Sequence, residues 1–320
     1  MPLQFSTEIV LLSAIDMADS QFRISDPRSL TPLIDSIQAV GLLVPPLVIP
    51  MDGDRYRIVS GFARIAACQK LAVENLLVRI AAADTSATEL IRAAVSENAL
   101  ARELTVMEKT RVVMLLQKGY PDPKAVTDVV QSLGIAESPE LVTKLSRLAH
   151  LPVFIQQAVE KGVVGLAMAL AMGRLESDAA QRLIQLYQML RLGLNRQREV
   201  LTLIQEIAKR ESLPITAVLA ADEISAAIYG AAKDRARRRS LFLHYLKKRR
   251  YPVLTQKEEL FSQLRQRLQL GPKVQINPPP YFEDGTYQLV LGFDSLDELD
   301  QRYRKVGEIK LDPNLIKWLG

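Results

Sequence analysis

Apolar residues in the first part of the chain follow two different periods. Short, mostly apolar stretches over 8–12 and 76–80 predict strands, and an Asp-Gly turn inside 46–59 predicts a β-hairpin. Helical spacing over 30–40 and 61–71 predicts two helices that lie between these strands in the sequence. The chain therefore begins with a segment of mixed α and β structure.

Helical spacing then continues almost unbroken to residue 228. We therefore divide the chain into an α+β domain over 1–84 and an all-α middle domain over 85–230. A basic helical connector over 231–270 and a small αβ unit over 271–320 follow. That last unit has two predicted strands and one predicted helix, which bury little apolar surface by themselves. Because a second copy would cover its apolar face, we expect it to be a dimerisation domain.

Two short helices are predicted at about 125–151, separated by a turn that contains Gly134. Leu141, Leu145 and Leu148 form the inner face of the second helix, and its outer face is polar and basic. A helix, a glycine-containing turn and a second helix with a polar, basic exterior are typical of a helix-turn-helix. An αα-hairpin inside a helical bundle has the same pattern and is the alternative.

The formal net charge of +5 is concentrated in one segment of the chain. Nine basic residues and one acid, Asp234, lie between Lys233 and Arg250, so this segment carries +8 and the rest of the chain −3. Such a block predicts a polyanionic partner, and a solvated helix face is the alternative. The residues of this block that we assign to DNA are Arg235, Arg237, Arg238, Arg239, Lys247, Lys248, Arg249 and Arg250.

Cysteine and histidine counts restrict the chemistry. One cysteine, Cys68, and two histidines are too few for a zinc finger or an internal disulfide. The longest apolar stretch, Val163–Met172, is about half of a membrane span. The chain opens without the charged segment and apolar run of a signal peptide. We therefore expect a folded, cytoplasmic protein with no membrane partner.

Two short motifs carry groups suited to phosphate or metal. A predicted strand runs through Gly61 directly into a helix that carries Arg64, and the free N–H groups at such a helix start suit a phosphate. Glu97 and Asn98 are adjacent on a predicted helix, where a carboxylate and a carboxamide suit Mg²⁺ or phosphate oxygens. An ordinary turn and an ordinary surface helix are the alternatives.

Taken together and in this order, these pieces resemble the ParB family of chromosome and plasmid partition proteins. The segments that carry the resemblance are Gln21–Arg23, Leu33–Val48, Tyr56–Ala67, Glu97-Asn98, Arg147–Pro152 and Val159–Ala169, with a fainter likeness at Tyr281–Leu299. The resemblance implies an N-terminal ParB/sulfiredoxin-like domain that binds CTP with Mg²⁺, and a helix-turn-helix that binds double-stranded DNA. It also implies a homodimeric, CTP-gated DNA clamp on the nucleoid and a Walker-type ATPase of the ParA type as partner.

The resemblance assigns roles residue by residue. The nucleotide-binding positions are Gln21, Arg23, Gly61, Arg64, Glu97, Asn98 and Arg102, of which Glu97 and Asn98 also hold the metal. The helix-turn-helix positions that face DNA are Ser138, Thr143, Lys144 and Arg147. No residue is assigned a catalytic role, and slow CTP hydrolysis is left open.

This chain departs from the family pattern mainly at the nucleotide site. Where the family has a Gly-Glu-Arg-Arg box, Phe62 and Ala63 replace the acid and the first arginine. The motif arginine after Glu97-Asn98 falls at Ala101, with Arg102 one residue further on. Two alternatives therefore stay open: a sequence-specific transcription regulator without nucleotide control, and an NTP-using enzyme such as a kinase. A sulfiredoxin-like reaction would need a reactive cysteine at the phosphate turn, whereas Cys68 lies about two turns into the helix.

Overall fold

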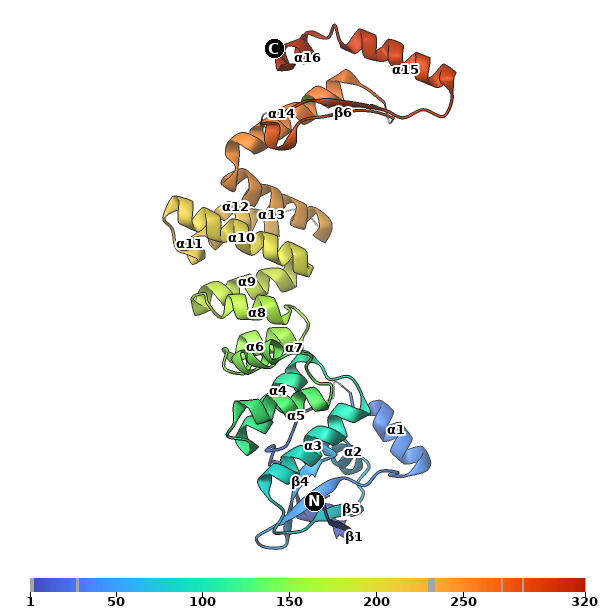
Figure 1. Ribbon diagram of the computed structural model, residues 1–320, viewed down its shortest axis with the longest axis vertical. Helices are drawn as coiled ribbons and strands as arrows, with labels where there is room; N and C mark the ends of the chain where they lie inside the picture. The colour runs from blue at the N-terminus through green and yellow to red at the C-terminus, as the bar shows by residue number, and fades with distance from the viewer. Residues whose placement is uncertain (1–2, 27–28, 230–233, 272, 284, 320) are drawn as a thin grey trace. The chain divides into compact units, whose positions relative to one another are not determined.

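The computed structural model describes residues 3–26, 29–229, 234–271, 273–283 and 285–319 (Figure 1). The chain forms two compact units, Met1–Gln188 and Met189–Gly320, which we describe separately. The mixed α+β character of the N-terminal part and the largely helical remainder are confirmed. The predicted domain limits at 84, 230 and 270 stay predictions.

The first unit begins with a five-stranded sheet in the order β1-β5-β3-β4-β2. The strands are β1 (Phe5–Leu11), β2 (Ile15–Asp16), β3 (Leu47–Met51), β4 (Arg55–Ser60) and β5 (Asn75–Ala81), and a 3₁₀ turn over Leu12–Ala14 joins the first two. β3 and β4 form the predicted antiparallel hairpin, whose turn places Gly53 and Asp54 at positive φ. β5 lies between β1, to which it is antiparallel, and β3, to which it is parallel.

Helices cover both faces of this sheet. On one face, Val48 and Ile58 pack in a cluster with Ile65 and Cys68 of α2 (Phe62–Lys70). On the other, Val59 of β4 packs in a cluster with Ile91 and Val95 of α3 (Ala87–Ala101). The remaining helix of this region is α1 (Thr31–Val40), which ends at Gly41 as the spacing predicted. Burial raises the pKa of the Cys68 thiol, so this cysteine lacks the lowered pKa of a reactive thiol.

The rest of the first unit is helical. Its helices are α4 (Val106–Gly119), α5 (Pro123–Ser132), α6 (Pro139–Ala149), α7 (Val153–Glu160), α8 (Leu166–Met172) and α9 (Ser177–Leu190), the last of which continues past the unit boundary. α3 and α4 each begin with a capping box, in which Ser86 pairs with Glu89 and Thr105 with Glu108. These caps fix where α4 starts beside the end of α3, which matters for the site below.

The second unit contains further helices and a two-stranded sheet. Its elements are α10 (Leu194–Glu211), α11 (Ile215–Leu219), α12 (Asp222–Tyr229), α13 (Arg235–Arg250), α14 (Pro252–Leu268), β6 (Val274–Asn277), a 3₁₀ turn (Pro280–Phe282), β7 (Gln288–Leu291), α15 (Leu296–Ile309) and α16 (Pro313–Leu319). The basic segment is thus a helix, α13, and Pro252 opens the next one. Phe261 and Leu264 of α14 share an apolar core with Val274 and Ile276 of β6. No helix among the described residues is long and apolar enough to cross a membrane.

Candidate nucleotide cleft and nucleic-acid interface

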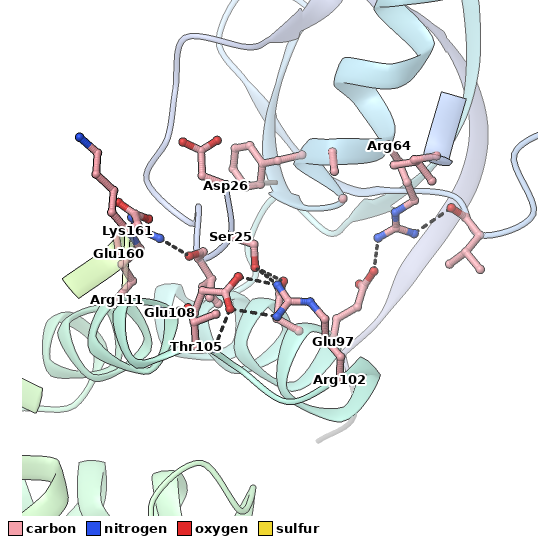
Figure 2. Close-up of a pocket in the computed structure, with 17 residues that line it drawn as sticks. Ser25, Asp26, Arg64, Glu97, Arg102, Thr105, Glu108, Arg111, Glu160 and Lys161 are labelled. Carbon is pink, nitrogen blue, oxygen red and sulfur yellow. Dashed lines mark hydrogen bonds and ion pairs between the residues drawn. The ribbon is translucent and has the colours of Figure 1, made fainter. Parts of the chain in front are cut away.

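A cleft in the first unit has a volume of about 1240 Å³ and collects most of the predicted nucleotide residues (Figure 2). Its wall is formed by residues 24–26, α1, the turn at 61–64, the ends of α3 and α7 and the start of α4. Gly61, Arg64, Glu97, Asn98 and Arg102 all line it. The structure therefore brings together five of the seven predicted positions, from two separate segments of the sequence.

The turn between β4 and α2 requires glycine. Gly61 has a φ of +91°, and a Cβ built on it would lie 2.7 Å from Cβ of Pro46. Any other residue would be strained by its backbone and would collide with a proline ring. The first residues of α2 directly follow, so its free N–H groups lie beside the cleft. This local geometry is what an anion site at a helix start needs.

Arg64 is held by protein groups in this structure. Its Nη1 donates to the carbonyl oxygen of Val44 at 2.8 Å, and its Nη2 forms an ion pair with Oε1 of Glu97. Oε2 of Glu97 accepts from Ser60 Oγ at 2.5 Å and from Arg79 Nη2 at 2.9 Å. Burial alone would raise the pKa of Glu97, but the Ser60 hydroxyl and the two guanidiniums hold that pKa below its usual value. Both oxygens of the predicted metal ligand are thus already engaged.

Sequence reasoning missed Arg79, which lies on β5. Its Nε also donates to the carbonyl oxygen of Pro45 at 3.1 Å, so it ties the segment before β3 to Glu97. The available signal was an arginine inside an otherwise apolar strand, because such a charge needs a partner when the strand is buried.

A second ion pair lies at the other side of the cleft. Arg102 pairs with Glu108, and its Nη2 also donates to Ser25 Oγ at 3.0 Å. The Glu108 side chain is 7% exposed. Burial raises its pKa, but hydrogen bonds from Arg102, Thr105 and Ser25 more than offset this and lower the pKa to about 2. The sequence did not predict this ion pair. Glu108 is also the acidic residue of the α4 capping box, and that role alone accounts for a glutamate at this position.

The remaining predicted nucleotide residues are Asn98, Arg23 and Gln21. Asn98 donates through Nδ2 to the carbonyl oxygen of Ala94 at 2.8 Å and accepts from Ser25 Oγ at 3.3 Å. Arg23 lies over the Phe62 ring, 5.0 Å from its centroid, so its guanidinium lies beside the phosphate turn. Gln21 is exposed and lies outside the residues that line the cleft.

Among the described residues that line the cleft, the formal charges balance. Arg64, Arg102, Arg111 and Lys161 are its cations, and Asp26, Glu97, Glu108 and Glu160 are its carboxylates. Arg111 pairs with Glu160 at 2.5 Å, so three of the four cations have a carboxylate partner. Among the described residues no three His, Cys, Asp or Glu side chains form a group that could hold a metal ion. As arranged, the protein groups do not form a ready Mg²⁺ site, because Glu97 and Asn98 are both occupied.

The predicted helix pair is present as α5 and α6. Val142, Leu145 and Leu148 of α6 are buried, while Thr143 and Lys144 are exposed. Leu141, which the spacing placed on the inner face, is only partly buried and packs at the edge of the same core. Gly134, at a φ of +65°, lies in the turn before α6. The second helix therefore presents a polar face above a buried apolar one.

The predicted DNA residues of α6 differ in their surroundings. Arg147 is exposed like Thr143 and Lys144. Ser138 is the N-cap of α6 and its Oγ accepts from the Leu141 N–H at 3.3 Å, so its hydroxyl is used to start the helix. Ser138 thus has a structural role irrespective of any role in DNA binding.

The basic block on α13 is partly neutralised within the second unit. Its four C-terminal cations each have an acidic partner: Lys247 with Glu199 at 3.2 Å, Lys248 with Glu259 at 3.8 Å, Arg249 with Glu211 at 2.6 Å and Arg250 with Glu206 at 2.7 Å. Within the described residues, Arg235, Arg237 and Arg239 have no such partner, whereas Arg238 is engaged in a further interaction. Lys233 lies outside the described residues. The free positive charge of the block is therefore concentrated at the start of the helix.

Comparison with known proteins matches residues 6–99 to the ParB N-terminal domain family. The chain is 33% identical over 174 residues to the probable chromosome 1-partitioning protein ParB of Deinococcus radiodurans, covering 54% of this chain and 57% of that protein. It is 33% identical over 176 residues to the chromosome-partitioning protein Spo0J of Thermus thermophilus, covering 54% of this chain and 61% of that one. A nucleoid occlusion protein of Listeria monocytogenes is 26% identical over 156 residues, 49% of this chain and 52% of that protein. The chain thus spans little more than half the length of these relatives.

Solved structures are similar at lower identity. The C-terminally truncated chromosome-partitioning protein ParB of Caulobacter crescentus, complexed to the centromeric parS site, is 18% identical with a TM-score of 0.36, covering 60% of this chain and 97% of that one. The same protein complexed with CTP-gamma-S is 21% identical with a TM-score of 0.28, covering 57% of this chain and 98% of that one. TM-scores of this size do not support transfer of geometry, so the contacts described above are those of this chain alone.

Proposed function

Residues 6–99 belong to the ParB N-terminal domain family, and from that premise we propose that the chain is a ParB-type DNA-binding protein in chromosome or plasmid partition. The observation that carries the proposal is α6, whose exposed Thr143, Lys144 and Arg147 lie above buried Leu145 and Leu148. A second helix with this division of faces is the part of a helix-turn-helix that enters the major groove. The relatives named as chromosome-partitioning proteins support the partition role.

A nucleotide is the ligand that we propose for the cleft, with CTP as the choice that the family resemblance favours. The Gly61 turn and the start of α2 are suited to its phosphates. Arg64 and Arg102 would contact phosphates by exchanging Glu97 and Glu108 for the ligand, and Arg23 would lie beside the same turn. Glu97 could take up Mg²⁺ only after such an exchange, since metals of this kind bind free carboxylate and phosphate oxygens.

A transcription regulator on the same scaffold, without nucleotide control, is the second candidate. The observation that favours it is the balance of four cations and four carboxylates around the cleft. A triphosphate entering such a cleft meets no net positive charge, and each arginine that it recruits leaves a carboxylate without its partner. This candidate shares the DNA-binding role of α6 and differs only in how binding is controlled.

We further propose that the end of the second unit pairs with a second copy of the chain. Leu289, Val290, Ile316 and Leu319 are each roughly half-exposed, and all of them except Val290 line a hollow of about 740 Å³. A two-stranded sheet with such apolar exposure gains stability when a second copy covers it. A homodimer in the cytoplasm, associated with the nucleoid and served by a ParA-type ATPase, completes the proposal.

The experiment that tests these proposals measures DNA and CTP binding together on the full chain. A DNA site is first selected from random duplexes, and labelled CTP is then bound with and without that site. CTP binding that is stimulated by the selected site supports the partition clamp, and strong DNA binding without any nucleotide effect supports the regulator. A chain that binds no DNA and transfers phosphate to a small molecule would overturn both in favour of an NTP-using enzyme.

A further inference from the structure

A small basic hollow lies at the C-terminal ends of α6 and α8 and shares Arg147 with the exposed face of α6. Its volume is about 280 Å³. Arg147 and His150 line it from α6 and its C-cap, and Arg174 lines it from the residue after Gly173, the C-cap of α8. Pockets that enclose a whole small molecule usually measure about 300–1,000 Å³, so this one lies near the lower end of that range and has room for one ionic group.

The hollow has the chemistry of an anion site. None of its lining residues is acidic, and within the described part of the chain neither Arg147 nor Arg174 forms an ion pair. This sets them apart from the arginines of the cleft, which are held by carboxylates. His150 Nδ1 lies 2.8 Å from the carbonyl oxygen of Ser146, so that nitrogen donates there, and Nε2 can donate to an anion only in the protonated ring.

The position on α6 indicates which anion this is. Recognition helices contact base edges through their N-terminal residues, while the flanking parts of the motif contact the phosphate backbone. Arg147 lies in the last turn of α6, and His150 is its C-cap. His150 is about 9 Å further along the helix axis than Lys144. We infer that Arg147, His150 and Arg174 form a seat for one phosphate of the DNA backbone. The inference rests on the proposed DNA-binding function and adds Arg174 and His150 to it.

The magnitude follows from counterion release. Each phosphate neutralised adds about 0.9 to the slope of log affinity against log salt, which corresponds to about fivefold in affinity at 0.15 M salt. Because a phosphate carries no sequence information, the loss should be equal on specific and random DNA. A base-contacting residue such as Lys144 should behave differently, with a larger loss on the specific site.

The test compares Arg174→Gln with Arg182→Gln in the full chain. Arg182 lies on α9 and pairs with Asp178, so its replacement removes the same charge outside the hollow. Affinity for the selected site and for a random-sequence duplex is measured over a series of salt concentrations, and thermal melting confirms folding. We expect Arg174→Gln to lose about fivefold on both duplexes and about 0.9 in slope, and Arg182→Gln to lose neither.

The outcomes separate this inference from the proposed function. If the native chain binds no DNA, the proposed function fails. If it binds DNA and Arg174→Gln retains the native affinity and slope, the phosphate seat is wrong while the function stands. Titration with inorganic phosphate distinguishes a DNA phosphate from a free anion. If phosphate alone saturates the hollow and Arg174→Gln leaves the DNA affinity unchanged, the hollow binds a free anion and the inference is overturned.

Discussion

The ion pairs on α13 predict that its two ends contribute unequally to DNA binding. Arg235 and Arg239 are four residues apart and share one face, and within the described residues neither has an acidic partner. Lys247 and Lys248 already pair with Glu199 and Glu259. Replacing Arg235 and Arg239 with Gln should remove two phosphate contacts, which lowers the salt slope by about 1.8. A fourfold rise in salt should then weaken the native chain about twelvefold more than the variant.

The matched control is the variant with Gln at Lys247 and Lys248, which removes the same charge from the other end of the same helix. These side chains are 50% and 61% exposed, so their loss leaves the buried Phe242 and Leu246 in place. The assay is equilibrium binding to a random-sequence duplex over a salt series, with thermal melting as the check on folding. Equal slope changes in the two variants would refute the reasoning, since they would show that the acidic partners do not withdraw these lysines from DNA.

Three further predictions concern α6, the cleft and the turn. Lys144→Ala should weaken binding to a selected DNA site more than to random DNA, and equal losses in a competition assay would exclude base contact by this residue. The pKa of Glu108 is lowered from 4.5 to about 2, so its ionised carboxylate stabilises the folded state. This contribution is complete above pH 4.5 and is lost as the pH falls towards 2, and from the size of the shift it amounts to about 3 kcal/mol. Urea unfolding at neutral and acid pH should therefore depend less on pH for Glu108→Gln, and an unchanged dependence would assign the acid sensitivity to other groups. Gly61→Ala should destabilise the first unit by about 1–3 kcal/mol and weaken CTP binding, because alanine is strained at a φ of +91° and meets Pro46 at 2.7 Å; a variant with native stability would contradict this account of the turn.

Much of the local structure could be predicted from the sequence. The predicted helix over 30–40 is α1, which ends at Gly41, and the Asp-Gly turn forms the β3–β4 hairpin. Each of these depends on residues within a few positions of one another, where spacing and turn chemistry are sufficient evidence. The short C-terminal helix α16 was missed, since seven residues provide too little periodicity to detect.

The sequence predicted which residues line the candidate site but not the residues with which they form ion pairs. Gly61, Arg64, Glu97 and Arg102 were all identified, and they do line one cleft. Their partners were not, because Arg79 lies in a strand and Glu108 in a capping box, and neither belongs to a motif. Whether an arginine is available to a phosphate depends on a carboxylate that folding brings to it from 33 residues away, as with Arg64 and Glu97.

By itself, the sequence determined the order of strands and helices, the glycine turn before α2, the two faces of α6 and the total charge of the basic block. These follow from local periodicity and from counting, and both are properties of the chain before it folds. The tertiary structure alone decided which of those charges are free. It pairs Lys247, Arg249 and Arg250 of the block with Glu199, Glu211 and Glu206 of α10, whereas Arg147 and Arg174 keep their charge beside a common hollow. The physical reason is that an ion pair requires a separation of a few ångströms in space, which distance along the sequence does not specify.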